Sequence, residues 1–155
     1  MHYFLCGFMA SGKSTTLKEI ENSQIFMGYK FIDLDCYIFE QYRESRHRNL
    51  GDLIKEKGFE WFRKIEKDSL MNIWSSKKTW TSLGGGTLDD SLVSFVAARE
   101  DISGFWINTS FKTCLKRIRK DEHRPLSVLS DSKLVELFSQ REVVYKKYPV
   151  YNNKA

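Results

Sequence analysis

The segment that begins at Gly7 contains the residue types that bind the phosphates of a nucleotide. It matches the pattern G-x-x-x-x-G-K-[ST], with its glycines at Gly7 and Gly12. Lys13 supplies a point charge, and the hydroxyl of Ser14 can ligate the Mg²⁺ that bridges the phosphates. The alternative is a glycine-containing turn that binds nothing. The apolar run at residues 3–6 predicts a strand directly before the motif, which favours the phosphate loop.

Two aspartates follow the second predicted strand, at residues 29–32. In open α/β sheets, ligands collect beyond the carboxyl ends of the strands. Asp33 and Asp35 are one residue apart, so on an extended segment they would lie on the same side. We expect Asp33 to contact Mg²⁺ and Asp35 to orient, and deprotonate, an attacking hydroxyl. A further interpretation, compatible with that role, is that Asp35 caps a helix at residues 36–43.

Two other stretches have the composition of binding loops. Three consecutive glycines at residues 84–86 follow the third predicted strand, and they let a backbone approach a ligand very closely. Residues from about 120 to 130 are polar and lack periodicity, which is typical of a mobile lid. A lid that carries Arg124 would exclude water during phosphoryl transfer.

The elements that must position these residues alternate along the chain. Predicted strands lie at residues 3–6, 29–32, 79–83 and 105–108. Predicted helices lie at residues 14–25, 36–43, 50–57, 59–75, 89–98, 111–120 and 131–145. This alternation predicts a three-layer α/β/α fold with a central parallel sheet of four or five strands. Residues 36–75 interrupt the alternation, and we interpret them as a helical substrate-binding lobe within a single domain at residues 1–155.

The composition indicates a globular protein. Of the 155 residues, 41% are hydrophobic, and the chain leads from Met1 into the first strand without a secretory signal. No apolar run approaches membrane-spanning length, so we expect a cytoplasmic protein without a membrane contact. A monomer is expected because no exposed apolar stripe is evident.

The charge, the cysteines and the histidines show which partners and metal sites are expected. The net charge of +5 suits nucleic acid or small anionic ligands equally, but no platform of aromatic and basic residues falls on one sheet face, so no nucleic-acid partner is expected. Cys6, Cys36 and Cys114 lack metal-ligand or disulfide spacing and are interpreted as buried free thiols. The histidines, including His2 and His47, are interpreted as surface or loop residues.

With these residues laid out, the chain resembles the shikimate kinase family, a small branch of the P-loop proteins related to nucleoside monophosphate kinases. The resemblance covers nearly the whole chain and rests on an ordered set of motifs. These are the phosphate loop, Asp33-x-Asp35, Phe62-Arg63, Ser82-Leu83-Gly84-Gly85-Gly86, Arg117, Arg124-Pro125-Leu126 and Arg141, four residues before Tyr145. The combination is specific, whereas the phosphate loop alone is shared by many families.

The resemblance implies transfer of the ATP γ-phosphate to the 3-hydroxyl of shikimate, with Mg²⁺ as cofactor, on the route to chorismate and the aromatic amino acids. The catalytic residues that it implies are Lys13, Asp35 and Arg124. ATP would contact Gly7, Ala10, Ser11, Gly12, Lys13, Ser14, Thr15, Arg117 and Arg124. Shikimate would contact Asp35, Arg63, Gly84, Gly85, Gly86 and Arg141. Mg²⁺ would be held by Ser14 and Asp33, with Ser82 nearby.

The two substrate arginines would grip the shikimate carboxylate, because planar guanidinium groups bind carboxylates bidentately. For Arg63 the alternative is a helical ion pair with Glu60 or Glu66. The family pattern has an acidic residue where this chain has Phe59, and it continues into a fifth strand and a terminal helix beyond the Arg141 helix. The alternatives are a related P-loop kinase, such as a gluconate kinase, and a non-catalytic nucleotide-binding module.

Overall fold

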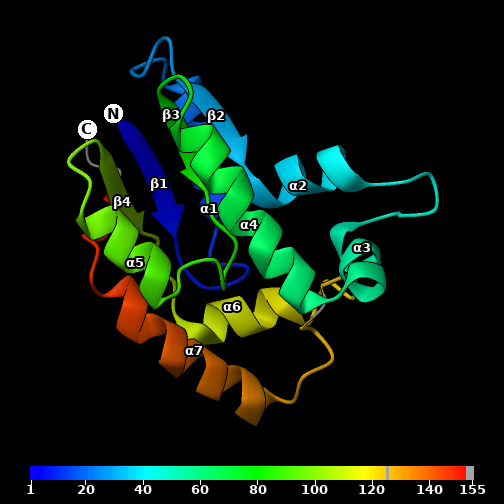
Figure 1. Ribbon diagram of the computed structural model, residues 1–155. Coiled ribbons are helices and arrows are strands. Elements are labelled where there is room, and N and C mark those ends of the chain that lie inside the picture. Colours follow the sequence, from blue (N-terminus) through cyan, green and yellow to red (C-terminus); the bar gives the residue numbers. More distant parts are fainter. Residues whose placement is uncertain (125, 153–155) are drawn as a thin grey trace.

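A four-stranded parallel sheet runs through the middle of the protein, which a computed structural model describes for residues 1–124 and 126–152 (Figure 1). The strand order is β2-β3-β1-β4, and all three pairs are parallel. The strands are β1 (His2–Cys6), β2 (Lys30–Asp33), β3 (Thr79–Ser82) and β4 (Ile102–Trp106). The expected parallel α/β fold is thereby confirmed, and the carboxyl ends of all four strands point to one edge of the sheet.

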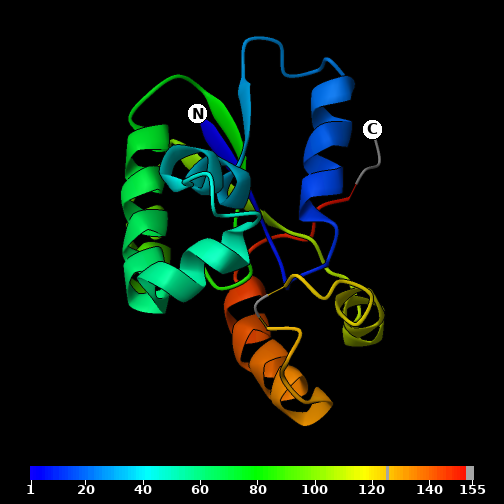
Figure 2. The same ribbon diagram turned by 90° about the vertical axis from the view of Figure 1, so that its right-hand side faces the viewer.

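Helices cover both faces of the sheet. They are α1 (Lys13–Asn22), α2 (Leu34–Tyr42), α3 (Leu50–Lys57), α4 (Phe59–Trp74), α5 (Asp90–Ala97), α6 (Phe111–Ile118) and α7 (Asp131–Tyr145). Helix α1 lies on one face, and α4 and α5 lie on the other (Figure 2). Helices α6 and α7 lie below the carboxyl ends of the strands, beside the phosphate loop (Figure 1). Helices α3 and α7 have the bounds that the sequence predicted.

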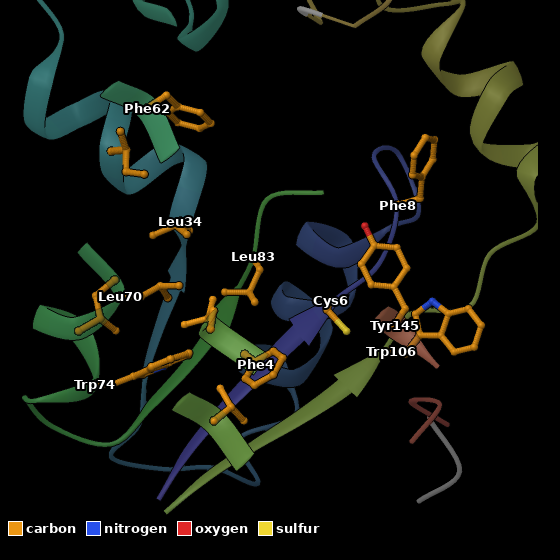
Figure 3. Packing of buried hydrophobic residues seen from close by; sticks show 14 of the residues in the cluster. Phe4, Cys6, Phe8, Leu34, Phe62, Leu70, Trp74, Leu83, Trp106 and Tyr145 are labelled. Carbon is orange, nitrogen blue, oxygen red and sulfur yellow. The ribbon is translucent and has the colours of Figure 1, made fainter. Parts of the chain in front are cut away.

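The two faces carry separate cores because alternate residues of a strand point to opposite sides. Phe4 and Cys6 of β1 belong to the larger cluster, which includes Trp74 of α4 and Tyr145 of α7 (Figure 3). Leu5, between them, packs in a smaller cluster under α1. That cluster is rich in aromatic rings, with Tyr3 stacked on Trp80 at a centroid distance of 4.7 Å and further rings from Phe26, Tyr29, Phe105 and Tyr151 around them.

Two elements have a boundary that differs by three residues from the sequence prediction, and most of the others differ by one or two. Strand β4 covers residues 102–106, whereas 105–108 was predicted. A glycine such as Gly104 is typical of a strand break, but here it lies directly against the ring of Phe4, where only a glycine leaves room. The first helix ends at Asn22 and not at residue 25, because Gln24 adopts a left-handed conformation with φ 58°.

The outer edge of β4 is partly covered by the end of the described chain. Trp106 N–H donates to the carbonyl of Pro149 at 2.8 Å, and the Trp106 carbonyl accepts from Tyr151 N–H at 2.9 Å. These bonds form a single parallel bridge between Trp106 and Val150. Within the described residues, the sheet therefore has four strands and one further bridge at the position of a fifth.

The expectations for His2 and Cys36 were wrong. His2 is buried in β1, with Nδ1 2.9 Å from the hydroxyl of Thr79. His47 lies in a loop, as one of the two expected positions, although it is buried; its Nδ1 accepts from Glu44 N–H, and Nε2 lies 2.7 Å from a carboxylate oxygen of Glu56. Of the cysteines, Cys36 is exposed, whereas the other two are buried as expected. No helix in the described part of the chain has the length and apolar character that a membrane crossing requires.

The contact between Gly104 and Phe4 predicts a test of the fold. A Cβ added at Gly104 would lie within 2.8 Å of three ring carbons of Phe4, which is itself fully buried. We expect Gly104→Ala to lower the free energy of unfolding by about 1–3 kcal/mol through overpacking. Urea unfolding measures the change, and Ser103→Ala, on the neighbouring half-buried position, is the control. Equal midpoints for the two variants would contradict this packing.

Candidate active site

The phosphate loop connects β1 to α1 with the geometry that its glycines permit. Gly12 has φ 101°, in the left-handed region that favours glycine, and it precedes the first residue of α1. A Cβ on Gly7 would lie 2.8 Å from the carbonyl oxygen of Ile107 and 2.9 Å from Ser11 Oγ. Both glycines are therefore needed for the loop to wrap at the N-terminus of a helix, where N–H groups and the helix dipole favour an anion.

Lys13 points back into this loop. Its Nζ donates to the carbonyl oxygens of Gly7 and Phe8, each at 2.9 Å. Burial lowers the pKa of Lys13 to about 8, although the nearby carboxylate of Asp35 partly opposes this shift. A phosphate group beside Nζ would add a negative charge and hence stabilise the charged amine.

Asp33 caps α2 and also contacts the phosphate loop. Its Oδ1 accepts from the backbone N–H of Cys36 at 3.2 Å, and its Oδ2 accepts a hydrogen bond from the hydroxyl of Ser14. The interpretation of Asp35 as the helix cap was therefore wrong, since Asp33 has that role. The expectation that both aspartates lie on an extended segment was also wrong, because α2 begins at Leu34.

Asp35 lies in the first turn of α2 with a buried, unpartnered oxygen. Its Oδ1 has no hydrogen-bond partner among the described residues. The pKa of Asp35 is raised to about 6, chiefly by burial and also by the carboxylates of Glu66 and Asp33, while Lys13 acts in the opposite direction. A carboxylate that is desolvated but not hydrogen-bonded is a good acceptor for a ligand hydroxyl.

A cavity of about 550 Å³ opens over the phosphate loop. It is lined by Ala10, Ser11, Gly12, Lys13, Ser14, Thr15, Thr16, Asp33, Asp35, Ser82, Leu83, Gly84, Gly85, Arg117 and Arg124. The residues predicted to contact ATP all line it except Gly7. Arg117 donates from Nη1 to the carbonyl of Ala10 at 3.0 Å, and Arg124 is paired with Asp121, with 3.0 Å between Nε and Oδ2.

A second cavity of about 110 Å³ adjoins the first. The six residues predicted to bind shikimate all line it, and Asp35, Gly84, Gly85 and Arg124 line both cavities. Its walls also include apolar side chains of the predicted substrate lobe, Leu50, Ile54, Phe59 and Phe62. The two cavities therefore meet at the unpartnered carboxylate of Asp35.

Two guanidinium groups converge in the smaller cavity. A Cβ on Gly86 would lie 2.5 Å from Nη2 of Arg63 and 2.7 Å from Nη2 of Arg141, so both groups pack directly on the glycine. Burial lowers the pKa of Arg141, which makes no ion pair with a carboxylate in the part of the chain that is described. Two adjacent cations, one of them unpaired, favour an anionic ligand between them.

Sequence reasoning missed the role of Glu66, which it treated only as a candidate ion-pair partner of Arg63. Glu66 is 1% exposed, accepts from the Thr87 hydroxyl at 2.6 Å and is paired with Arg63. A Cβ on Gly84 would meet Glu66 Oε1 at 2.8 Å and Asp35 Oδ1 at 3.1 Å, so the two carboxylates lie close together. The signal in the sequence was an acidic residue within the apolar stripe of α4.

Tyr145 holds the glycine segment from the other side. It lies at the end of α7 and donates its hydroxyl proton to the carbonyl of Gly85. Burial raises its pKa, so the hydroxyl stays protonated and can donate. Arg141, one turn earlier on the same helix, lies over the ring of Phe8 with 5.8 Å between Cζ and the ring centroid. Helix α7 thus positions both the glycine segment and one of the two guanidinium groups.

A phosphate loop on a parallel sheet, next to a second cavity that contains two guanidinium groups, is the arrangement of a P-loop kinase. The comparisons with known proteins agree. The family described as shikimate kinase matches residues 9–154. A shikimate kinase of Persephonella marina is 31% identical over 142 residues, which cover 92% of this chain and 82% of that protein. The chain belongs to the shikimate kinase family and is an enzyme, an ATP-dependent kinase.

Solved structures lead to the same fold. A shikimate kinase from Bacteroides thetaiotaomicron superimposes with a TM-score of 0.76 at 26% identity, covering 98% of this chain and 86% of that one. One from Acinetobacter baumannii, solved in complex with shikimate, gives 0.78 at 23% identity over 99% and 84% of the two chains. A deoxyadenosine kinase from M. mycoides shares the fold more distantly, with a TM-score of 0.59 at 15% identity over 97% and 89%.

The raised pKa of Asp35 predicts a pH-dependent stability. Because the folded protein binds this proton more tightly than the unfolded chain, the favourable contribution is complete below the ordinary aspartate pKa of 3.8 and is lost as pH rises through about 6. Asp35→Asn should therefore raise the free energy of unfolding at pH 8 by on the order of 2 kcal/mol, and by much less near pH 4.5. Urea unfolding at the two pH values measures this, with the exposed Asp68→Asn as control. A gain in the free energy of unfolding that is the same at both pH values would contradict the raised pKa of Asp35.

Proposed function

We propose that the shikimate kinase reaction, transfer of the γ-phosphoryl group of ATP to the 3-hydroxyl of shikimate, takes place where the two cavities meet. The observation that carries this proposal is the position of Asp35, whose unpartnered oxygen borders both cavities. The larger cavity takes the polyphosphate and the smaller takes shikimate. An acceptor hydroxyl and a phosphoryl donor can then approach each other at one carboxylate.

Asp35 is the group that orients the hydroxyl and takes its proton. The hydroxyl oxygen forms a bond to the γ-phosphorus, the bond from that phosphorus to the bridging oxygen breaks, and ADP leaves with the electron pair. With a pKa of about 6, Asp35 is mostly ionised at neutral pH and still basic enough to accept the proton. Its closeness to Lys13 keeps the proton acceptor beside the phosphate site.

The phosphates of ATP lie on the N–H groups of the phosphate loop, with Lys13 and Arg124 beside them. Lys13 leaves the carbonyls of Gly7 and Phe8 for the outer phosphates, and Arg124 neutralises charge that builds during transfer. Arg117, on the rim of the same cavity, lies against the adenine.

The carboxylate of shikimate binds between Arg63 and Arg141. Support comes from the convergence of both guanidinium groups above Gly86 and from the unpaired state of Arg141 within the described residues. Gly84 and Gly85 line the ring of the substrate, since no side chain there fills the space between the two cavities. Glu66 fixes Arg63 in place through their ion pair.

Mg²⁺ fits the oxygens of Ser14 and Asp33. The hydroxyl and the carboxylate are in hydrogen-bond contact and line the larger cavity, and both are the hard oxygen donors that this ion prefers. No group of three or more potential metal ligands occurs in the described residues, which suits an ion held mainly by phosphates and water. When bound, Mg²⁺ neutralises phosphate charge and orients the γ-phosphoryl group.

The enzyme acts as a monomer in the cytoplasm, without nucleic acid or a membrane as partner. Support for the monomer is that all proposed binding groups come from one chain. Two buried free thiols, Cys6 and Cys114, fit a reducing compartment that also supplies ATP. The monomer is tested by size-exclusion chromatography with light scattering.

Release of ADP tests the reaction. With magnesium-ATP, we expect the purified protein to release ADP when shikimate is added, but not with gluconate or without a substrate, and not when EDTA removes the metal. Release with gluconate alone would identify a related P-loop kinase. Measurable ATP binding with no release for any substrate would indicate a nucleotide-binding module and overturn the proposal.

The unpaired cation predicts a substrate-specific defect. Arg141→Met keeps a long apolar side chain but removes the charge, so the KM for shikimate should rise by roughly thirtyfold or more, from a loss of about 2 kcal/mol or more. The KM for ATP should stay near that of the wild type. Arg99→Met is the matched control, because Arg99 is paired with Asp101 at the opposite end of the sheet. Equal effects on both substrates would remove Arg141 from the shikimate site.

A further inference from the structure

We propose that Thr109 is a positioning residue that orients the phosphate loop toward the nucleotide from outside the cavity. This inference deepens the proposed function and rests on it, since it assumes that the loop binds the phosphates of ATP. Thr109 follows β4, and its hydroxyl donates to the backbone carbonyl of Ser11 at 2.7 Å, although the two residues are 98 positions apart. Neither cavity of the site is lined by Thr109.

The hydrogen bond acts on a peptide unit whose other end belongs to the phosphate site. In a trans peptide, the carbonyl of Ser11 and the N–H of Gly12 point in opposite directions within one plane. Thr109 holds the carbonyl outward, so the N–H of Gly12 is turned toward the side of the cavity that Gly12 lines. The Thr109 hydroxyl thereby fixes the direction of the Gly12 N–H, which donates a hydrogen bond to a phosphate, without itself touching the ligand.

This peptide unit needs an external anchor because its neighbours are unusual. Ala10 has φ 59°, a left-handed conformation that is unfavourable for a residue with a side chain. Gly12, on the other side, has φ 101° and great backbone freedom. Without the hydrogen bond to Thr109, the peptide unit between Ser11 and Gly12 can rotate at low cost. The Gly12 N–H then no longer points toward the phosphate.

The preceding peptide unit of the phosphate loop, between Ala10 and Ser11, is held by a second side chain, Arg117. Arg117 of α6 donates to the carbonyl of Ala10 at 3.0 Å, and Ser11 N–H closes the loop on the carbonyl of Phe8 at 3.2 Å. Thr109 is itself held by the segment that follows β4, because its N–H donates to the carbonyl of Ile107 at 3.1 Å, and Ile107 N–H donates to the carbonyl of Cys6 in β1 at 2.8 Å. Thr109 and Arg117 therefore bind two successive carbonyls of the loop, and of these two residues Thr109 is the one that does not line the cavity.

The experiment measures the affinity for magnesium-ATP and for inorganic tripolyphosphate by titration calorimetry, with shikimate as a second ligand. Thr109→Val keeps the shape and removes the donor, so both phosphate ligands should bind roughly fivefold more weakly, as for one hydrogen bond of about 1 kcal/mol. The affinity for shikimate should not change. Thr109→Ser, which keeps the hydroxyl, should restore the affinity for tripolyphosphate.

Thr81→Val is the matched control, because Thr81 is fully buried and its hydroxyl has no partner in the described chain. It should leave tripolyphosphate binding unchanged. Wild-type affinity for tripolyphosphate in a folded Thr109→Val protein would overturn the inference, as would an equal loss of shikimate affinity, which would indicate general loosening. If the valine variant does not fold, Thr109→Ala removes the same hydroxyl. Tripolyphosphate binding needs no turnover, so a failure of the shikimate reaction would show separately in the ADP assay.

Discussion

The site depends on how two buried carboxylates are kept side by side. Asp35 and Glu66 both lie against Gly84, and their repulsion adds to the desolvation of Asp35. Glu66 is paired with Arg63 and accepts a hydrogen bond from Thr87, so both of its carboxylate oxygens have partners within the fold. The charges of Lys13 and Arg63 oppose the effect at Asp35, but its Oδ1 has no hydrogen-bond partner among the described residues. The fold therefore keeps one carboxylate satisfied and leaves the other with an open oxygen for a ligand.

This arrangement requires backbone without side chains at its centre. The glycine segment after β3 packs against the two carboxylates at Gly84 and against the two guanidinium groups at Gly86, and a Cβ at either position would meet charged atoms at 3.1 Å or less. Its conformation is held by Tyr145, which reaches Gly85 from α7. Residues from the middle and the end of the chain thus meet at one short loop. Because the glycines have no side chains, the charged groups can lie close to a ligand.

The parallel sheet explains why one edge of the molecule contains every functional group. Strands β1, β2 and β3 end at the phosphate loop, at Asp33 and at the glycine segment, and they are neighbours in the order β2-β3-β1. Strand β4 ends beside the phosphate loop and adds Thr109, which orients the loop without contacting the cavity. A parallel arrangement of short strands is enough to assemble the site, because the loops at their carboxyl ends are also where helices begin.

The sequence by itself determined the strand and helix order, the phosphate loop, and most of the charged and glycine residues that line the two cavities, since these depend on local patterns and on motifs with fixed spacing. Only the tertiary structure decided which aspartate caps α2, that Glu66 is buried beside Asp35, and that Gly104 lies within a strand. It also decided the burial of His2 and His47, and the contact from Thr109 to Ser11. Each of these depends on which distant segment packs against a residue, and periodicity along one segment contains no information about its neighbours in space.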